Sequence, residues 1–274
     1  MARIAYRSLY SDLTRLKDDA NLKDPAAGTG DDPELWELLV DVSEWIDHYT
    51  NRHFYPRVQT LEFDGDGSID LLIPDLAAIT SLKTDDNDDQ TYETTWATTD
   101  YYLHPLNAEP TQAWGQPYTM ARVRSGGTKD AWPSGQSAVE IVGRWGYKEF
   151  KEDSGSNIND AGGISATDTT VGVTAGTDFA IGQTILIESE QMLITNISAN
   201  NLTVLRALNG TTGATHADAT DVYILRWPRA VERAALIQTS RLWTRAPGFE
   251  PFYVDADVDT DVRLLLDGLR RLTV

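Results

Sequence analysis

Apolar residues recur at helical spacing in two long stretches of the chain. The first begins with Asp32-Pro33-Glu34, a typical helix start, because Asp caps free backbone N–H groups and Pro fits the first turn. The residues that then give this helix one wide apolar face are Leu35, Leu38, Leu39, Val42, Trp45, Ile46 and Tyr49. The helix should end near Asn51. A second long helix is predicted over residues 228–246 and a shorter one over residues 8–17.

Between residues 55 and 146 the apolar spacing changes to two, which is typical of strands. Alternation over residues 58–63, the turn Asp64-Gly65-Asp66-Gly67 and the apolar run 69–73 predict a β-hairpin. Further strands are expected at 79–83, 100–103 and 138–145. Residues 105–133 are rich in Pro, Gly and Trp, so we expect a long ordered loop there. The aromatic residues expected to pack it are Trp114, Tyr118 and Trp132.

Residues 151–225 have a different composition from the chain on either side. They open with a stretch rich in Gly, Ser, Asn and Asp, residues 152–163, which we interpret as a linker because it has too little apolar surface to form core. Short β-rich runs separated by polar turns follow at 184–188, 191–197, 201–205 and 221–225. These runs predict a small all-β domain, either a barrel or a sandwich.

Together the patterns predict an α+β fold with a helical-bundle core and a small antiparallel sheet or hairpin. Residues 1–150 and 226–274 should form this core, with residues 151–225 inserted into it as the β domain. An inserted β unit adds surface to a scaffold, and such additions serve contacts more often than catalysis.

Composition excludes several classes of function. The formal charge of −19 and the pI near 4.4 argue against a protein that grips nucleic acid or an anionic membrane, since phosphate binding needs clustered Lys and Arg. The chain has no cysteine, which excludes disulfides, thiolate metal sites and cysteine nucleophiles. No signal-peptide core and no run near the ~20 apolar residues of a membrane span is present, so we expect a soluble protein.

No motif of a catalytic, cofactor-binding or metal site is present, and we expect no enzyme activity and no cofactor. The four histidines lack metal-ligand spacing. Of two acidic runs, Asp85–Asp89 could hold a cation loosely but is better explained as a solvated loop. The other, residues 255–261, has Thr260 where a calcium loop needs Gly. A hydrolase with paired carboxylates stays open, because any two of the 42 acids could meet in space.

Two features near the C-terminus point to contacts. In and just before the second long helix, five arginines fall within one broad arc: Arg226, Arg229, Arg233, Arg241 and Arg245. Pairing with acids of a neighbouring element or subunit is the favoured explanation, and contact with DNA phosphates is the alternative. The last helix carries more leucine than a solvated tail would, at Leu264, Leu265, Leu266, Leu269 and Leu272. It should dock on its own domain or on a partner.

Part of the β domain resembles a module that recurs as an insert in tailed-bacteriophage structural proteins. The resemblance lies in Gly182-Gln-Thr-Ile-Leu-Ile-Glu-Ser-Glu-Gln-Met-Leu-Ile194, in Leu202-Thr-Val-Leu-Arg-Ala-Leu-Asn-Gly-Thr-Thr212 and in His216. The surrounding chain resembles the head–tail connector (adaptor) family of the same viruses. That resemblance is carried by the helix opened by Asp32-Pro33 and ending in Thr50-Asn-Arg-His-Phe-Tyr-Pro56, by Phe63-Asp-Gly-Asp-Gly67, Leu72-Ile-Pro74 and Ile79-Thr-Ser-Leu-Lys83, and by the helix start Trp227-Pro-Arg229.

The resemblance implies a virion structural protein of the neck, assembled in the host cytoplasm. Such adaptors form a homo-oligomeric ring, generally a dodecamer, that binds the portal, extends the channel for genome ejection and carries stopper, tail or collar proteins. Double-stranded DNA would pass without sequence-specific binding, and no membrane is involved. The arginines would then lie between subunits or along the channel, and the C-terminal leucines would dock on the portal. Typical adaptors lack the insert, which leaves open a tail or neck component whose β module binds a receptor or glycan.

Overall fold

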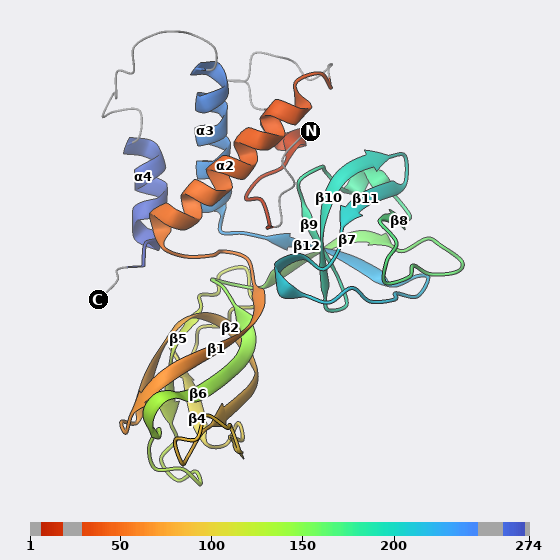
Figure 1. The fold of residues 1–274 in the computed structure, drawn as a ribbon. Coiled ribbons are helices and arrows are strands. Elements are labelled where there is room, and N and C mark those ends of the chain that lie inside the picture. Colours follow the sequence, from red (N-terminus) through yellow and green to blue (C-terminus); the bar gives the residue numbers. More distant parts are fainter. Residues whose placement is uncertain (1–6, 19–28, 246–259, 272–274) are drawn as a thin grey trace. The chain divides into compact units, whose positions relative to one another are not determined.

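The computed structural model of the chain describes residues 7–18, 29–245 and 260–271 (Figure 1). Contacts divide these residues into two compact units, one drawn from residues 1–52 and 151–274 and the other from residues 53–150. This division differs from the predicted domains, which joined residues 1–150 with 226–274. The helices share a unit with residues 151–225, and residues 53–150 form the other unit.

In its described part, the first unit contains the α-helices of the chain. They are α1 (Leu13–Asp18), α2 (Asp32–Thr50), α3 (Arg229–Arg245) and α4 (Thr260–Leu266). The helix predicted from Asp32 is confirmed, although Asp31 rather than Asp32 occupies the capping position and makes no side-chain cap bond. It ends where Asn51 adopts a left-handed conformation (φ 51°) and its N–H donates to the Asp47 carbonyl. None of the described helices is long and apolar enough to cross a membrane.

The segment before α1 joins the helices to a β-sheet of the same unit. The Trp227 indole N–H donates to the Leu9 carbonyl over 2.8 Å, and the Leu13 N–H donates to the Ile181 carbonyl over 2.9 Å. A buried apolar cluster spans helices and sheet, with members Leu9, Leu13, Leu16, Leu35, Trp36, Leu39, Val40, Leu193 and Leu208. Helices and sheet therefore share one core, which burial of apolar surface stabilises.

The sheet of the first unit has six strands in the order β7-β12-β9-β10-β11-β8, and every residue-by-residue pairing recorded in it is antiparallel. Its strands are β7 (Phe150–Asn157), β8 (Thr170–Gly172), β9 (Thr184–Ile187), β10 (Glu190–Ser198), β11 (Asn201–Leu205) and β12 (Asp221–Arg226). The four predicted β runs correspond to β9, β10, β11 and β12. The linker predicted over residues 152–163 is wrong, because β7 occupies its first half, residues 152–157. A polar sequence suffices there since β7 is an edge strand, and its Ser154 hydroxyl bonds the Val222 carbonyl over 2.5 Å.

The second unit is built on a sheet in the order β1-β6-β2-β5-β4, with β3 paired to β2. The bounds are β1 (Arg57–Asp66), β2 (Asp70–Thr84), β3 (Thr94–Thr95), β4 (Tyr101–His104), β5 (Tyr118–Val123) and β6 (Ser134–Trp145). The predicted hairpin of β1 with β2 is wrong, because β6 lies between them: Ile141 pairs with Leu61 on one side and Leu82 on the other. The turn signal fixes a chain reversal, but it does not choose the partner strand.

The stretch predicted as a long loop, residues 105–133, contains the strand β5. Its Trp132 is fully buried and stacks on Trp96, with ring centroids 4.2 Å apart. Trp114 does not pack the loop as predicted, since 76% of its surface is exposed. The strand was missed because the Pro, Gly and Trp residues around Tyr118–Val123 favoured a loop. Pairing with β2 on one side and β4 on the other makes this segment a strand.

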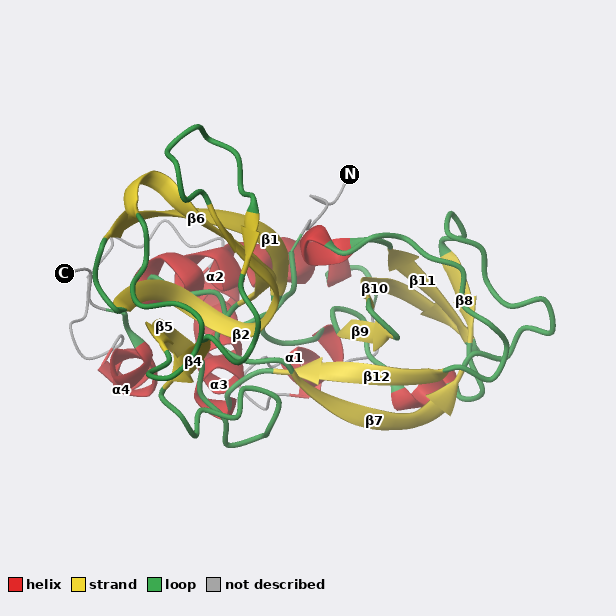
Figure 2. Ribbon diagram, turned by 90° about the horizontal axis from the view of Figure 1, so that it is seen from below, coloured by secondary structure: helices red, strands yellow, loops and turns green. Residues whose placement is uncertain are grey.

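The predicted helical-bundle core is wrong. Each unit is built on a six-stranded sheet, and the helices are few (Figure 2). The prediction failed because strong amphipathic helices are visible in the sequence, whereas strands such as β5 and β7 are recognisable only beside their partners.

Candidate functional site

A buried cluster of charged side chains lies in the first unit, around Glu190 at the start of β10. Glu190 is 0% exposed, and the Arg206 guanidinium donates two hydrogen bonds of 2.7 Å to its carboxylate. The same guanidinium donates to the carbonyls of Ser165, Asp168 and Ala214 over 2.6–2.8 Å. Arg206 thereby ties two loops to the carboxylate of one strand.

His216 and two backbone amides complete the set of groups around Glu190. The His216 Nε2 atom lies 3.0 Å from one Glu190 oxygen, and its Nδ1 atom lies 2.7 Å from the carboxylate of the exposed Glu188. The amides of Ala207 and Ala214 donate to Glu190 over 3.1 and 2.9 Å. Each carboxylate oxygen of Glu190 therefore has at least two partners, which uses its acceptor capacity.

The environment of Glu190 keeps it ionised. Burial raises the pKa of this carboxyl, but hydrogen bonds from Arg206, then His216 and the two amides, outweigh burial and lower the pKa to about 2. With both oxygens occupied, this carboxylate stays charged near neutral pH and has no free lone pair with which to bind a cation. The cluster is thus a structural clamp that holds the loops around residues 165–168 and 207–216 against β10.

This clamp was missed in the sequence analysis, although the four ionisable residues that form it were singled out there. Glu188, Glu190, Arg206 and His216 stand inside the stretches that carry the resemblance to the phage module. A signal was present, because an Arg and a His in a short β-rich segment with two acids form a possible buried network. Their partners depend on the register of β9, β10 and the following loops, which the sequence does not state.

The acidic run Asp85–Asp89 forms a loop that its own first residue organises. The Asp85 carboxylate is buried and accepts backbone N–H bonds from Asn87, Asp88, Asp89 and Gln90 over 2.6–3.3 Å. Burial raises the pKa of Asp85, but these bonds outweigh it and the net pKa is lowered. Residues 86–89 are exposed, as expected of a solvated loop, and the buried Asp85 carboxylate closes the turn.

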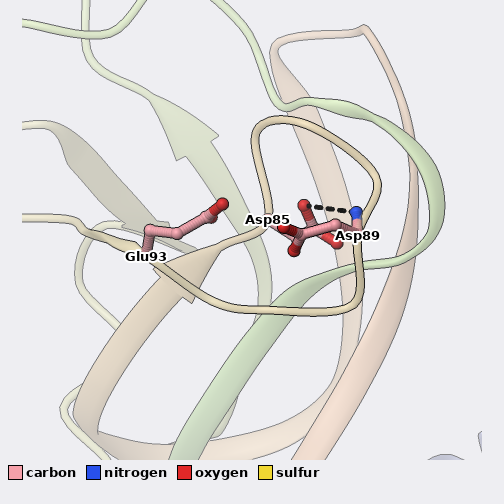
Figure 3. A group of neighbouring side chains, drawn as sticks. All are labelled: Asp85, Asp89 and Glu93. Atoms are coloured by element: carbon pink, nitrogen blue, oxygen red, sulfur yellow. Dashed lines mark hydrogen bonds between the residues drawn. The ribbon is translucent and has the colours of Figure 1, made fainter.

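Asp85, Asp89 and Glu93 gather carboxylate oxygens within 4.8 Å of one another (Figure 3). Figure 3 also shows the Asp89 amide donating to Asp85. Calcium needs six to eight oxygen ligands. Both oxygens of Asp85 already serve backbone amides, and the other two acids are exposed, so the group does not make a cation site. The calcium-like run at residues 255–259 lies outside the described residues.

The predicted arginine stripe divides into paired and unpaired members. Arg226 pairs with Glu152 and Arg241 pairs with Asp261, each over 2.5 Å. Arg229 and Arg233 are exposed on α3, and within the described parts of the chain no acid lies within ion-pair distance of either. The side chain of Arg245 lies outside the description. A role of this stripe between subunits or along a channel stays a prediction.

The C-terminal helix docks on its own unit. Val262 and Leu266 of α4 are buried against a neighbouring helix, α3. Of the leucines predicted to dock on a portal, Leu265 and Leu269 are half-buried, Leu264 is 77% exposed and Leu272 lies outside the described residues. Among the described members of this set, Leu264 is thus the one whose side chain is exposed.

Comparison with known proteins gives no relative: no family model, curated protein or solved structure matches this chain. The function has to be argued from the residues described above.

Proposed function

We propose that this chain is a virion structural protein of a tailed bacteriophage, a head–tail adaptor that forms a ring beneath the portal. The observation that carries the proposal is how the helical part is assembled. α1 and α2 from the start of the chain pack with α3, which in turn packs with α4 near its end, and both sheets are formed by the intervening residues. A ring repeats one interface on every subunit, and the proposal assigns that interface to the helical part and contacts with other proteins to the β units.

The boundaries of the helices support the same assignment. The motif Thr50-Asn-Arg-His-Phe-Tyr-Pro56 begins at the last residue of α2, and Trp227-Pro-Arg229 leads into the first residue of α3. These motifs resemble connector sequences at the points where the chain leaves and re-enters the helical part. Because the expected helical-bundle core is overturned, the proposal depends on the helical scaffold and these motifs rather than on the fold class.

The charge of the chain suits a channel that DNA traverses. A ring of copies that each carry −19 repels the phosphate backbone, so duplex DNA passes without being held. Portal, stopper and tail or collar proteins are the proposed partners, in the neck of the virion. The role is structural, and no enzyme activity is assigned: the best-formed charged cluster, around Glu190, has every acceptor occupied.

Native mass spectrometry combined with negative-stain imaging tests this proposal, on the protein alone and mixed with the portal protein of the same virus. A closed twelve-fold ring, or a monomer that assembles on the portal, is the expected result. A stable trimer or hexamer that ignores the portal would overturn it and favour the receptor- or glycan-binding alternative. That alternative has little support in residues 151–226, all of which are described, because no large apolar or aromatic side chain there is exposed for stacking on a sugar.

A further inference from the structure

Two exposed arginines on α3 have no ion-pair partner in the described parts of the chain. Arg229 and Arg233, here called the arginine patch, are four residues apart and so share one face of the helix. Like charges at this spacing repel each other, which costs the isolated helix stability. An opposite charge from outside the helix would remove that cost.

A matching pair of acids stands on α2. Glu34 and Glu37, here called the acidic patch, are exposed and three residues apart, with the exposed Asp41 one turn further on. Within the described residues, no base lies within ion-pair distance of Glu34 or Glu37. Like the arginine patch, these two acids are a pair of like charges on one face of a helix, but their charge is negative.

Several other charges on these helices pair inside the chain. Arg15 pairs with Glu232 over 2.8 Å, and Lys17 pairs with Asp32. Arg241 of α3 also pairs with Asp261 of α4, so these three contacts join helices of the same part. The two patches are exceptions: both are exposed, both are like-charged, and nothing in the described chain neutralises either.

We infer that the arginine patch of one copy binds the acidic patch of a second copy of this chain. The inference rests on the proposed function, since it names the contact by which the ring closes. Two different patches on one chain make a head-to-tail contact, and a head-to-tail contact that repeats with rotation generates a ring. The partner is a second copy because this chain carries both the positive and the negative patch. The two charges of each patch lie three or four residues apart, and the patches are on two helices that pack together.

A charge-swap experiment tests the contact. One variant carries Arg229→Glu with Arg233→Glu, and the other carries Glu34→Arg with Glu37→Arg. All four side chains are exposed, and Glu and Arg are both good helix formers, so each variant should fold, which circular dichroism checks. For each variant alone, the fraction of protein found in rings by native mass spectrometry should fall by about tenfold or more. An equimolar mixture should restore rings that contain both variants in equal number, because every contact is then between opposite charges.

Two controls sharpen the result. Arg124→Glu with Lys129→Glu changes the formal charge equally but lies in the second unit, so it should leave assembly unchanged. If Glu34→Arg with Glu37→Arg melts early, Glu34→Gln with Glu37→Gln replaces it, and the loss of rings should persist. Wild-type rings should also weaken as salt is raised above about 0.1 M, where screening acts over about 10 Å.

The possible failures are distinct. If the wild-type protein forms rings and both charge variants form them equally well, the patch contact is wrong and the proposed function stands. If the wild-type protein forms no ring, alone or on the portal, the proposed function falls and takes this contact with it.

Discussion

At the scale of single residues, Arg206 holds the most consequential contacts of the first unit. Replacing it with Ala would leave the Glu190 carboxylate buried without its main partner, and uncompensated buried charge costs about 3–5 kcal/mol. We therefore expect Arg206→Ala to lower the free energy of unfolding by about this amount in urea titrations. Arg226→Ala is the matched control. Its partner Glu152 is about half exposed, so the loss should stay below about 1 kcal/mol. Equal losses would contradict the clamp.

The pKa of Glu190 gives a second prediction at this scale. The carboxyl has a lowered pKa of about 2 against an ordinary value of 4.5, so its charged form stabilises the fold at and above pH 4.5. That stability should be lost as the pH falls from about 4.5 towards 2. Comparison with Glu190→Gln isolates the effect from the other acids. The difference in unfolding free energy between the two proteins should be large at pH 7 and shrink steadily below pH 4.5. A constant difference would show that Glu190 does not act through its charge.

At the scale of elements, the loop between β2 and β3 depends on one carboxylate. Asp85→Ala removes the acceptor of four backbone N–H groups at residues 87–90, and we expect their amide hydrogen exchange to accelerate by about tenfold or more. Glu93→Ala is the control, since Glu93 is exposed in the same acidic group. Equal protection in both variants would mean that the strands alone hold the loop closed.

At the scale of the whole molecule, the two units should unfold as separate transitions, because each has its own core. Ile141 is fully buried in the second unit, and Ile141→Ala should cost about 2–5 kcal/mol there and lower only one transition in calorimetry. Ile185→Ala, in the core of the first unit, should lower the other. If both transitions moved together in either variant, the chain would fold as one cooperative body.

The elements that could be predicted from the sequence are those whose contacts are local. α2 and α3 were predicted because helix hydrogen bonds join residues four apart, and an apolar face at that spacing is visible in any sequence. The strands β9 to β12 were predicted from short β-rich runs between turns. The absence of cysteine likewise excluded disulfides directly.

Only the tertiary structure decided which distant residues meet. β6 separates β1 from β2, and β7 becomes an edge strand, because strand partners are chosen by contacts across many residues of chain. The tertiary structure also decided which charged side chains are paired. The sequence placed the arginines on one helical arc, but it could not show that Arg226 ends β12 and is paired, whereas Arg229 is exposed on α3. It could not predict the clamp at Glu190 either, because burial and partnership are properties of the packed chain.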